Sequence, residues 1–290
     1  MNYRHQFHAG NFADVVKHVL LGTLFRGLQR KEKGFLFLDT HAGRGKYDLQ
    51  ASDWGQSLPR EPEHPQGYGR VRSAAEQAPP SVQAYVKTVE DFDRRCGNLT
   101  EILRFYPGSP WLARLWMRPQ DRLALCELNP SEHEALAREF FSEPRVSVYQ
   151  KDGYAAIRAL LPPGEKRALV LIDPPFEAMN EWASLVGGIA EILRRMPSTT
   201  IAVWYPITER AKLDLFLQEV LRLDPPPAWS ADVCIAGEGH GLKMRGCGVL
   251  VINPPWQLEG EIAPALRWLA TTLAQAPGAQ GNLTWIVPER

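Results

Sequence analysis

The sequence predicts an α/β protein built on a doubly wound, mostly parallel sheet. From residue 122 onward, short apolar runs typical of buried strands alternate with amphipathic segments typical of helices. Two apolar runs, 35–39 and 167–172, lead into an acidic residue and a turn rich in glycine or proline. Ligands of doubly wound proteins bind at the carboxyl ends of such strands, so these turns are the first candidates for a functional site.

Composition and charge are those of an ordinary globular protein. The chain has 290 residues, of which 44% are hydrophobic and 23% are charged, and its net charge is zero. Its four cysteines form no C-x-x-C pair, which favours a reduced, cytoplasmic protein over a zinc or redox protein. No apolar run approaches the roughly 18 residues of a membrane span. We therefore expect no membrane association, and we expect a monomer.

Positive charge is concentrated near the N-terminus. Residues 1–46 hold eight Lys and Arg against three acids. A solvated helix face and a contact with nucleic-acid phosphates both explain such a cluster. His5 and His8 stand beside Tyr3 and Arg4 ahead of the first strand, and this concentration suggests a segment that caps a cofactor or grips a substrate. The spacing of the histidines does not favour a metal site.

The first part of the chain predicts a helix, a strand and an insertion. Residues 11–30 carry apolar side chains at helical spacing, with Asn11 as a plausible N-cap. About 80 residues separate the strand at 35–39 from the next clear strand, far more than a crossover needs. We expect a loop over 53–80 and a helix over 81–95 in this gap. The resulting division is a core made of 1–46 and 106–290, with a small helical insertion subdomain at 47–105.

The rest of the chain alternates regularly. Predicted helices cover 110–118, 131–141, 181–195, 208–222 and about 261–274, with one further short helix behind the strand at 146–153. Predicted strands cover 122–130, 146–153, 167–176 and 200–206, followed by a closing pair at 233–237 and 248–256 and a terminal strand at 283–287. This terminal antiparallel addition fits the Rossmann-like fold of class I S-adenosylmethionine-dependent methyltransferases, which is the fold class that we expect.

The motif Asp173-Pro174-Pro175-Phe176 carries the most specific chemistry. The amino group of adenine is a poor nucleophile because its lone pair is delocalised into the ring. A carboxylate that accepts its protons localises this lone pair, and the prolines stiffen the turn. An aromatic ring can stack on an unpaired or flipped base, which contributes about 1–3 kcal/mol. We predict Asp173, Pro174 and Phe176 as catalytic residues; the alternative is a strand-ending turn with an Asp N-cap.

A near-copy of this motif occurs at Asn253-Pro254-Pro255-Trp256. If the preceding strand is the antiparallel member of the closing pair, its carboxyl end points away from the cofactor edge. We therefore interpret 253–256 as a structural turn and assign the chemistry to Asp173.

Three strand ends predict a site for S-adenosylmethionine, which would leave as S-adenosylhomocysteine. The turn at 39–45 contains Gly43 and matches neither a phosphate-binding P-loop nor a dinucleotide motif. Glu127 ends the second strand, where an acid can accept both ribose hydroxyls. Asp152 and Gly153 end the third, where a carboxylate can bind the adenine amino group. Each acid alone is more often a helix cap, but their order along the chain favours a cofactor site. We expect no metal.

Several segments resemble the RlmJ family of bacterial 23S ribosomal RNA adenine-N6 methyltransferases. They are Y-R-H-Q-F-H-A-G-N-F-A-D-V-V-K-H (3–18), L-D-T-H-A-G-R-G (38–45), Y-P-G-S-P (106–110), I-D-P-P-F (172–176) and W-I-V-P-E (285–289). The resemblance spans nearly the whole chain. It implies a class I methyltransferase with a helical insertion, 23S ribosomal RNA as partner, and methylation of an adenine N6.

The resemblance also implies roles for individual residues. Tyr3 would meet the RNA, with Arg4 and His8 beside it. Family members commonly carry tyrosine where Phe176 stands, and phenylalanine keeps the stacking face. The residues expected to contact the cofactor are His18, His41, Gly43, Ser109, Glu127, Asp152, Gly153 and Asp173, and Asp173 would also be the catalytic acceptor.

Three alternative functions stay open at this point. An adenine-N6 methyltransferase of DNA and a glutamine-N5 methyltransferase of protein both use a similar [DN]-P-P-aromatic turn. A non-catalytic RNA-binding factor in ribosome assembly is the third alternative, and the acids at the strand ends count against it.

Overall fold

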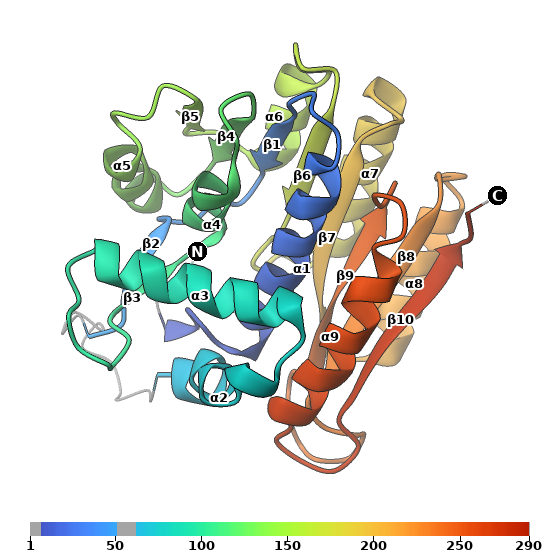
Figure 1. Ribbon diagram of the computed structural model, residues 1–290. Coiled ribbons are helices and arrows are strands. Elements are labelled where there is room, and N and C mark those ends of the chain that lie inside the picture. Colours follow the sequence, from blue (N-terminus) through green and yellow to red (C-terminus); the bar gives the residue numbers. More distant parts are fainter. Residues whose placement is uncertain (1–6, 51–61, 290) are drawn as a thin grey trace.

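The computed structural model describes residues 7–50 and 62–289, and eight strands of this part form one sheet (Figure 1). Its order is β10-β8-β9-β7-β6-β1-β4-β5. The strands are β1 Leu36–Asp39, β4 Arg122–Cys126, β5 Val146–Tyr149, β6 Ala168–Ile172, β7 Thr200–Ile207, β8 Ala228–Cys234, β9 Gly246–Ile252 and β10 Gln280–Val287. All pairings from β7 to β5 are parallel, and those of β9, β8 and β10 are antiparallel. The predicted sheet with its antiparallel addition is confirmed.

Helices cover both faces of the sheet. Figure 1 shows α1, α3 and α9 in front of the strands and α6, α7 and α8 behind them. Their bounds are α1 Phe12–Gln29, α3 Pro80–Arg95, α9 Glu259–Thr272, α6 Gly153–Leu160, α7 Glu181–Arg195 and α8 Arg210–Leu221. Because side chains of a strand alternate between faces, Phe37 packs into one hydrophobic cluster while Leu36 and Leu38 pack into the other. The sheet thus lies between two cores.

Two short strands bring the ends of the predicted insertion together. β2 Lys46–Asp48 pairs antiparallel with β3 Phe105–Pro107. Between them, the described residues form α3 and the short helix α2 Tyr68–Ser73. The prediction of loop throughout 53–80 is therefore wrong at α2. Buried Tyr68 and Val71 and a hydrogen bond from Tyr68 N to Gly10 O (2.8 Å) fix this helix, so tertiary contacts override a proline-rich neighbourhood.

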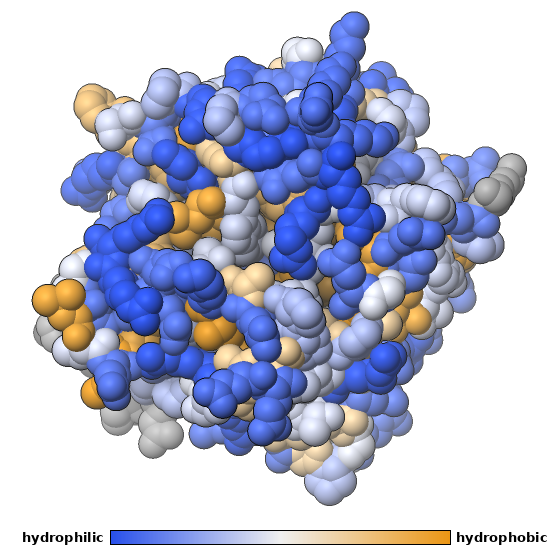
Figure 2. Space-filling model, in the orientation of Figure 1, coloured by the Kyte–Doolittle hydropathy of each residue, from blue (hydrophilic) through white to orange (hydrophobic). Residues whose placement is uncertain are grey.

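The remaining helices are short. α4 Ser109–Trp116 follows β3, and α5 Pro130–Glu139 connects β4 to β5. The largely hydrophilic face that carries α3 and α9 is visible in Figure 2, where hydrophobic residues are scattered among polar ones. Among the described residues, no helix has the length and apolar character that crossing a bilayer demands.

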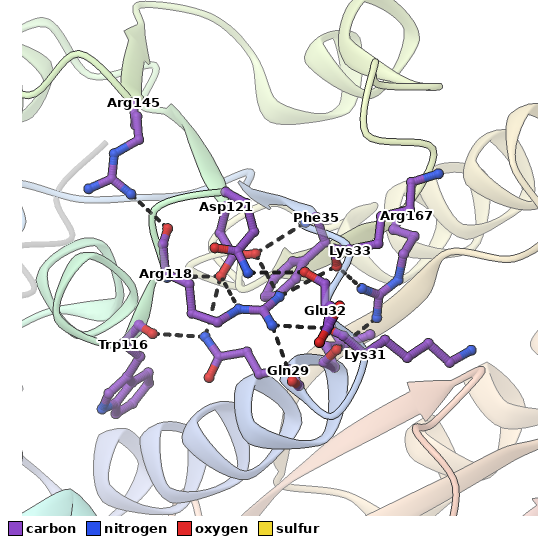
Figure 3. A network of polar contacts seen from close by, with 12 residues as sticks. Gln29, Lys31, Glu32, Lys33, Phe35, Trp116, Arg118, Asp121, Arg145 and Arg167 are labelled. Carbon is purple, nitrogen blue, oxygen red and sulfur yellow. Dashed lines mark hydrogen bonds and ion pairs between the residues drawn. The ribbon is translucent and has the colours of Figure 1, made fainter.

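A polar network fixes the connection between α1 and β1 at the end of the sheet opposite the strand carboxyl ends (Figure 3). Buried Asp121 accepts hydrogen bonds from Arg118 Nη2 (3.0 Å), from Arg118 N (2.9 Å) and from Phe35 N (3.3 Å). Arg118 also donates to the carbonyl oxygens of Gln29 and Lys31 (3.1 and 2.9 Å). Burial alone would raise the pKa of Asp121, but the hydrogen bonds from Arg118 outweigh this effect and lower the pKa. The network therefore anchors the start of β1.

Loss of this anchor should destabilise the protein. We expect Asp121→Ala to lower the free energy of unfolding by about 3 kcal/mol, because removal of one partner leaves the guanidinium with its carbonyl contacts but no counter-charge. Urea denaturation followed by circular dichroism measures the change. Asp91→Ala removes a more exposed acid, paired with Lys87, and should cost no more than about 1 kcal/mol. Equal midpoints for both variants would rule out the anchoring role.

Candidate functional site

A cavity of about 760 Å³ opens at the carboxyl ends of the parallel strands. The loops after β1, β4, β6 and β7 line it, together with α1 and the start of α6. The predicted site residues that lie in the described part all line this cavity: His8, His18, His41, Gly43, Ser109, Glu127, Asp152, Gly153, Asp173, Pro174 and Phe176. Tyr3 and Arg4 lie outside the described residues. The individual roles stay predictions, but the side chains share one space.

The turn after β1 forms one wall of the cavity. Gly43 has φ +59°, a left-handed conformation that favours glycine. Its N–H donates to Glu127 Oε2 (2.9 Å), which links the first strand end to the second. Burial raises the pKa of Asp39 to about 7, although Ser109 opposes this shift. Ser109 Oγ donates to Asp39 Oδ2 (2.7 Å), so the serine is fixed at the start of α4.

The acids that follow β4 and β5 lie along the same wall. Burial raises the pKa of Glu127, although hydrogen bonds from the backbone N–H groups of Asn129 and Gly43 oppose it. Asp152 accepts a hydrogen bond from Ala155 N (2.9 Å) and is the N-cap of α6. Asp152 is therefore a helix cap, as an isolated acid at a strand end usually is, and it also borders the cavity.

Close packing at Gly153 shapes the cavity floor. A Cβ atom at this position would lie 2.1 Å from Thr40 O, so only glycine lets α6 approach the first strand end so closely. With the left-handed turn at Gly43, it leaves backbone rather than side chains against the space where a small molecule would lie. Acids on adjacent strand ends and a glycine-lined floor fit an S-adenosylmethionine site.

The catalytic candidate Asp173 forms an ion pair that the sequence analysis did not anticipate. Lys17 Nζ lies 2.5 Å from Asp173 Oδ2 and 2.9 Å from Asp14 Oδ1. Burial would lower the pKa of Lys17, but the two carboxylates outweigh it and raise the pKa well above its usual value. Asp14 is itself held by the backbone N–H of Gly10 (3.0 Å). α1 thus brings a buried cation against the acid that follows β6.

Lys17 is a functional candidate that was not identified from the sequence, where it is one of eight basic residues near the N-terminus. By its position Lys17 belongs to the basic cluster of residues 1–46, yet only 6% of its side chain is exposed. Asp14, three residues before Lys17, was the available signal for this role. Two opposite charges at helical spacing within an otherwise apolar helix indicate that the two side chains are buried together. The more accessible members Arg26, Arg30 and Arg44 pair with Glu261 or Glu132 instead.

Phe176 lies in an aromatic cluster at the cavity edge. Its ring contacts Trp182 (centroids 4.9 Å apart) and Trp204 (5.7 Å), both in edge-to-face orientation. Its φ of +51° is strained for a bulky residue, and such conformations gather at functional sites. The turn therefore holds the ring in place, as base stacking would require.

His8, His18 and His41 line the cavity, whereas His5 lies outside the described residues. His18 Nδ1 lies 2.9 Å from Tyr106 Oη, and burial lowers the pKa of His41 to about 4, so His41 is neutral at pH 7. His8 Nδ1 lies 2.9 Å from Glu63 Oε2 and thereby joins the N-terminal segment to the insertion. Within 7–50 and 62–289, no group of His, Cys, Asp or Glu side chains has a metal-binding arrangement.

The near-copy at 253–256 lies outside the cavity. β9 runs antiparallel to β7, so its carboxyl end points to the opposite edge of the sheet, as predicted. Asn253 Nδ2 donates to Thr199 O (3.0 Å), and Asn253 O accepts from Thr200 Oγ1 (2.8 Å). Asn253 therefore fixes the start of β7.

Comparisons with known proteins agree on one family. A family model described as ribosomal RNA large subunit methyltransferase D, RlmJ, matches residues 32–287. Two curated relatives, both called ribosomal RNA large subunit methyltransferase J, align over 289 residues and over the full length of both chains. The one from Escherichia coli K12 is 37% identical, and the one from Haemophilus influenzae Rd is 34% identical.

One solved structure is similar over almost the entire chain. Protein LPL1258 from Legionella pneumophila is 33% identical, with a TM-score of 0.84, and the match covers 96% of this chain and 98% of that one. The similarity therefore includes the N-terminal helix, the insertion and the antiparallel strands.

Proposed function

The chain belongs to the RlmJ family of ribosomal RNA large subunit methyltransferases, and from this membership we propose that it transfers a methyl group from S-adenosylmethionine to N6 of an adenine in 23S ribosomal RNA. The observation that carries the choice of atom is Asp173, which lies in the cavity directly after β6. A ribosomal RNA substrate also fits the expected cytoplasmic location.

Asp173 is proposed as the acceptor for the N6 protons. Lys17, which also pairs with Asp14, fixes one oxygen of this carboxylate from one side. A hydrogen bond from N6 to this carboxylate localises the nitrogen lone pair. Phe176 is placed to stack on an extruded adenine, and Pro174 keeps the turn rigid.

The cofactor would occupy the opposite part of the cavity. Glu127 would accept the ribose hydroxyls, Asp152 would lie near the cofactor adenine, and the backbone at Gly43 and Gly153 would leave room for the ligand. When bound, S-adenosylmethionine supplies a methyl group on a positively charged sulfur. N6 forms a bond to this carbon as the carbon–sulfur bond breaks, and N6 then loses a proton through Asp173 to solvent. Orientation supplies much of the acceleration.

The segment 47–105 is proposed as an insertion subdomain that supports the site. The β2–β3 pair closes its two ends, and the buried hydroxyls of Tyr85 and Tyr106 lie 2.7 Å apart beside His18. Glu63 contacts both His8 and Asn11. These contacts order the N-terminal segment that leads to Tyr3 and Arg4, which we propose as RNA contacts.

Removal of the Glu127 carboxylate should weaken cofactor binding. We expect Glu127→Ala to raise the Kd for S-adenosylmethionine by about 10- to 100-fold, because two charge-assisted hydrogen bonds are lost. Isothermal titration calorimetry measures this constant. Glu134→Ala, an exposed acid on α5, is the control and should leave Kd unchanged. Similar Kd values for wild type and Glu127→Ala would remove Glu127 from the cofactor site.

A side-by-side acceptor assay separates the proposed substrate from its rivals. Labelled S-adenosylmethionine is incubated with the protein and 23S ribosomal RNA, duplex DNA or a cell protein extract. Label in RNA alone is the expected result. Label in DNA or protein would favour one of the other enzymes that use this turn, and absence of cofactor binding in calorimetry would favour the non-catalytic factor.

A further inference from the structure

We propose that a second groove, beside the catalytic cavity, binds the nucleotide next to the target adenine. This inference rests on the proposed function and specifies how the RNA strand is held. The groove measures about 460 Å³ and is lined by residues 208–211 at the start of α8 and by 237–242 and 245 in the loop between β8 and β9. We call it the side groove.

The side groove adjoins the catalytic cavity. Thr208 lines both spaces, and Met244 lines the cavity while the adjacent Arg245 lines the side groove. An adenine bound between Asp173 and Phe176 would therefore have its neighbour in the strand close to the side groove.

The loop between β8 and β9 is fixed at its base and open at its tip. Ile235 N donates to Arg245 O (2.8 Å), and Arg245 N donates to Ile207 O (3.1 Å), which anchors both ends of the loop to the sheet. Gly239 and Gly241 have φ of +85° and +71°, and a Cβ atom on either would meet open space. His240 between them is exposed, so its ring faces solvent at the groove.

The chemistry of the lining suits a nucleotide. Unpaired RNA is recognised by stacking on histidine or arginine planes and by hydrogen bonds to base edges. Arg210 pairs with Asp214 (2.9 Å), and both side chains are about half exposed. Exposed ion pairs contribute little, so the Arg210 guanidinium can exchange Asp214 for the substrate. Arg245, which is only 17% exposed, pairs with the exposed acid Glu238 (3.0 Å). The lining carries two acids as well, which favours base recognition over a purely electrostatic phosphate track.

The test compares two cations of the same helix. Arg210 lines the side groove, whereas Lys212 does not, and each is exposed and paired with a nearby acid. We expect Arg210→Ala and His240→Ala each to raise the KM for RNA by about five- to tenfold, which is the lower range for the loss of one stacking contact. The kcat and the Kd for S-adenosylmethionine should stay unchanged in both variants. Lys212→Ala should leave all three constants within twofold of wild type.

Substrates with one abasic neighbour identify the bound nucleotide. Once the methylated adenine is known, short RNAs lacking the base on its 5′ or its 3′ side are compared. For one of these RNAs, the KM of wild type should rise by the same factor that Arg210→Ala causes with the intact RNA. The KM of the Arg210→Ala variant should not rise further with this abasic RNA. Unchanged KM in both variants, or losses that multiply for both RNAs, would overturn the proposal.

A binding readout keeps this proposal separate from the proposed function. Fluorescence anisotropy with labelled single-stranded fragments of 23S ribosomal RNA, in the presence of S-adenosylhomocysteine, reports the RNA Kd without turnover. If wild type methylates no RNA, the proposed function fails, and weaker RNA binding by Arg210→Ala would still support the side groove. If wild type methylates RNA and Arg210→Ala binds RNA like wild type, only the side groove fails.

Discussion

We expect Asp173→Ala to lower kcat for methyl transfer by about 1,000-fold or more. The variant lacks the only carboxylate proposed to accept the N6 protons, and a correctly placed acceptor contributes about 10²–10⁴ in rate. Single-turnover assays with labelled S-adenosylmethionine measure the loss, and circular dichroism confirms folding. The Kd for S-adenosylmethionine should change by less than about tenfold, because Glu127 and the glycine-lined floor stay in place.

The near-copy of the motif provides a matched control for Asp173. Asn253→Ala changes the equivalent first position of the second Pro-Pro turn, at the opposite edge of the sheet. It removes the side-chain hydrogen bonds to the carbonyl oxygens of Pro197 and Thr199 and should cost stability while leaving kcat per folded molecule unchanged. Full turnover by Asp173→Ala would remove Asp173 from the mechanism.

The second large effect is expected at Lys17. Lys17→Met keeps the length and packing of the side chain but removes its charge. Asp14 and Asp173 then face each other without a cation, and we expect kcat to fall by about 100-fold, the scale of losing one preorganised electrostatic contact.

The conservative variant Lys17→Arg separates this role from a purely structural one. It keeps a positive charge between Asp14 and Asp173, so it should recover part of the rate that Lys17→Met loses. Lys87→Met, on an exposed face of α3, is the control and should match wild type. Equal rate losses in Lys17→Arg and Lys17→Met would assign Lys17 to packing alone.

Much of the fold follows from local sequence patterns. The continuous apolar run before Asp173 and the alternation of strands and helices predicted β6 and its neighbours. β8, by contrast, begins at Ala228, five residues before the prediction. The part of β8 that was not predicted contains Trp229, Ser230 and Asp232, and burial of Ser230 depends on pairing with β9 and β10 rather than on an apolar pattern.

The candidate site was less accessible to sequence reasoning. Strand-end acids such as Glu127 and Asp152 could be placed because parallel strands end at one edge of a sheet. The pairing of Lys17 with Asp173 could not be placed, because it joins residues 156 positions apart through the docking of α1. The side groove depends in the same way on a loop that meets α8 only in the folded chain.

The most direct test of N6 methylation uses protein-free 23S ribosomal RNA from cells that lack this protein. The RNA is incubated with purified protein and labelled S-adenosylmethionine and then digested to nucleosides for chromatography. Label in N6-methyladenosine, lost in the Asp173→Ala variant, is the result that we predict. Label in any other nucleoside, or no label in RNA when S-adenosylmethionine binding is intact, would contradict it.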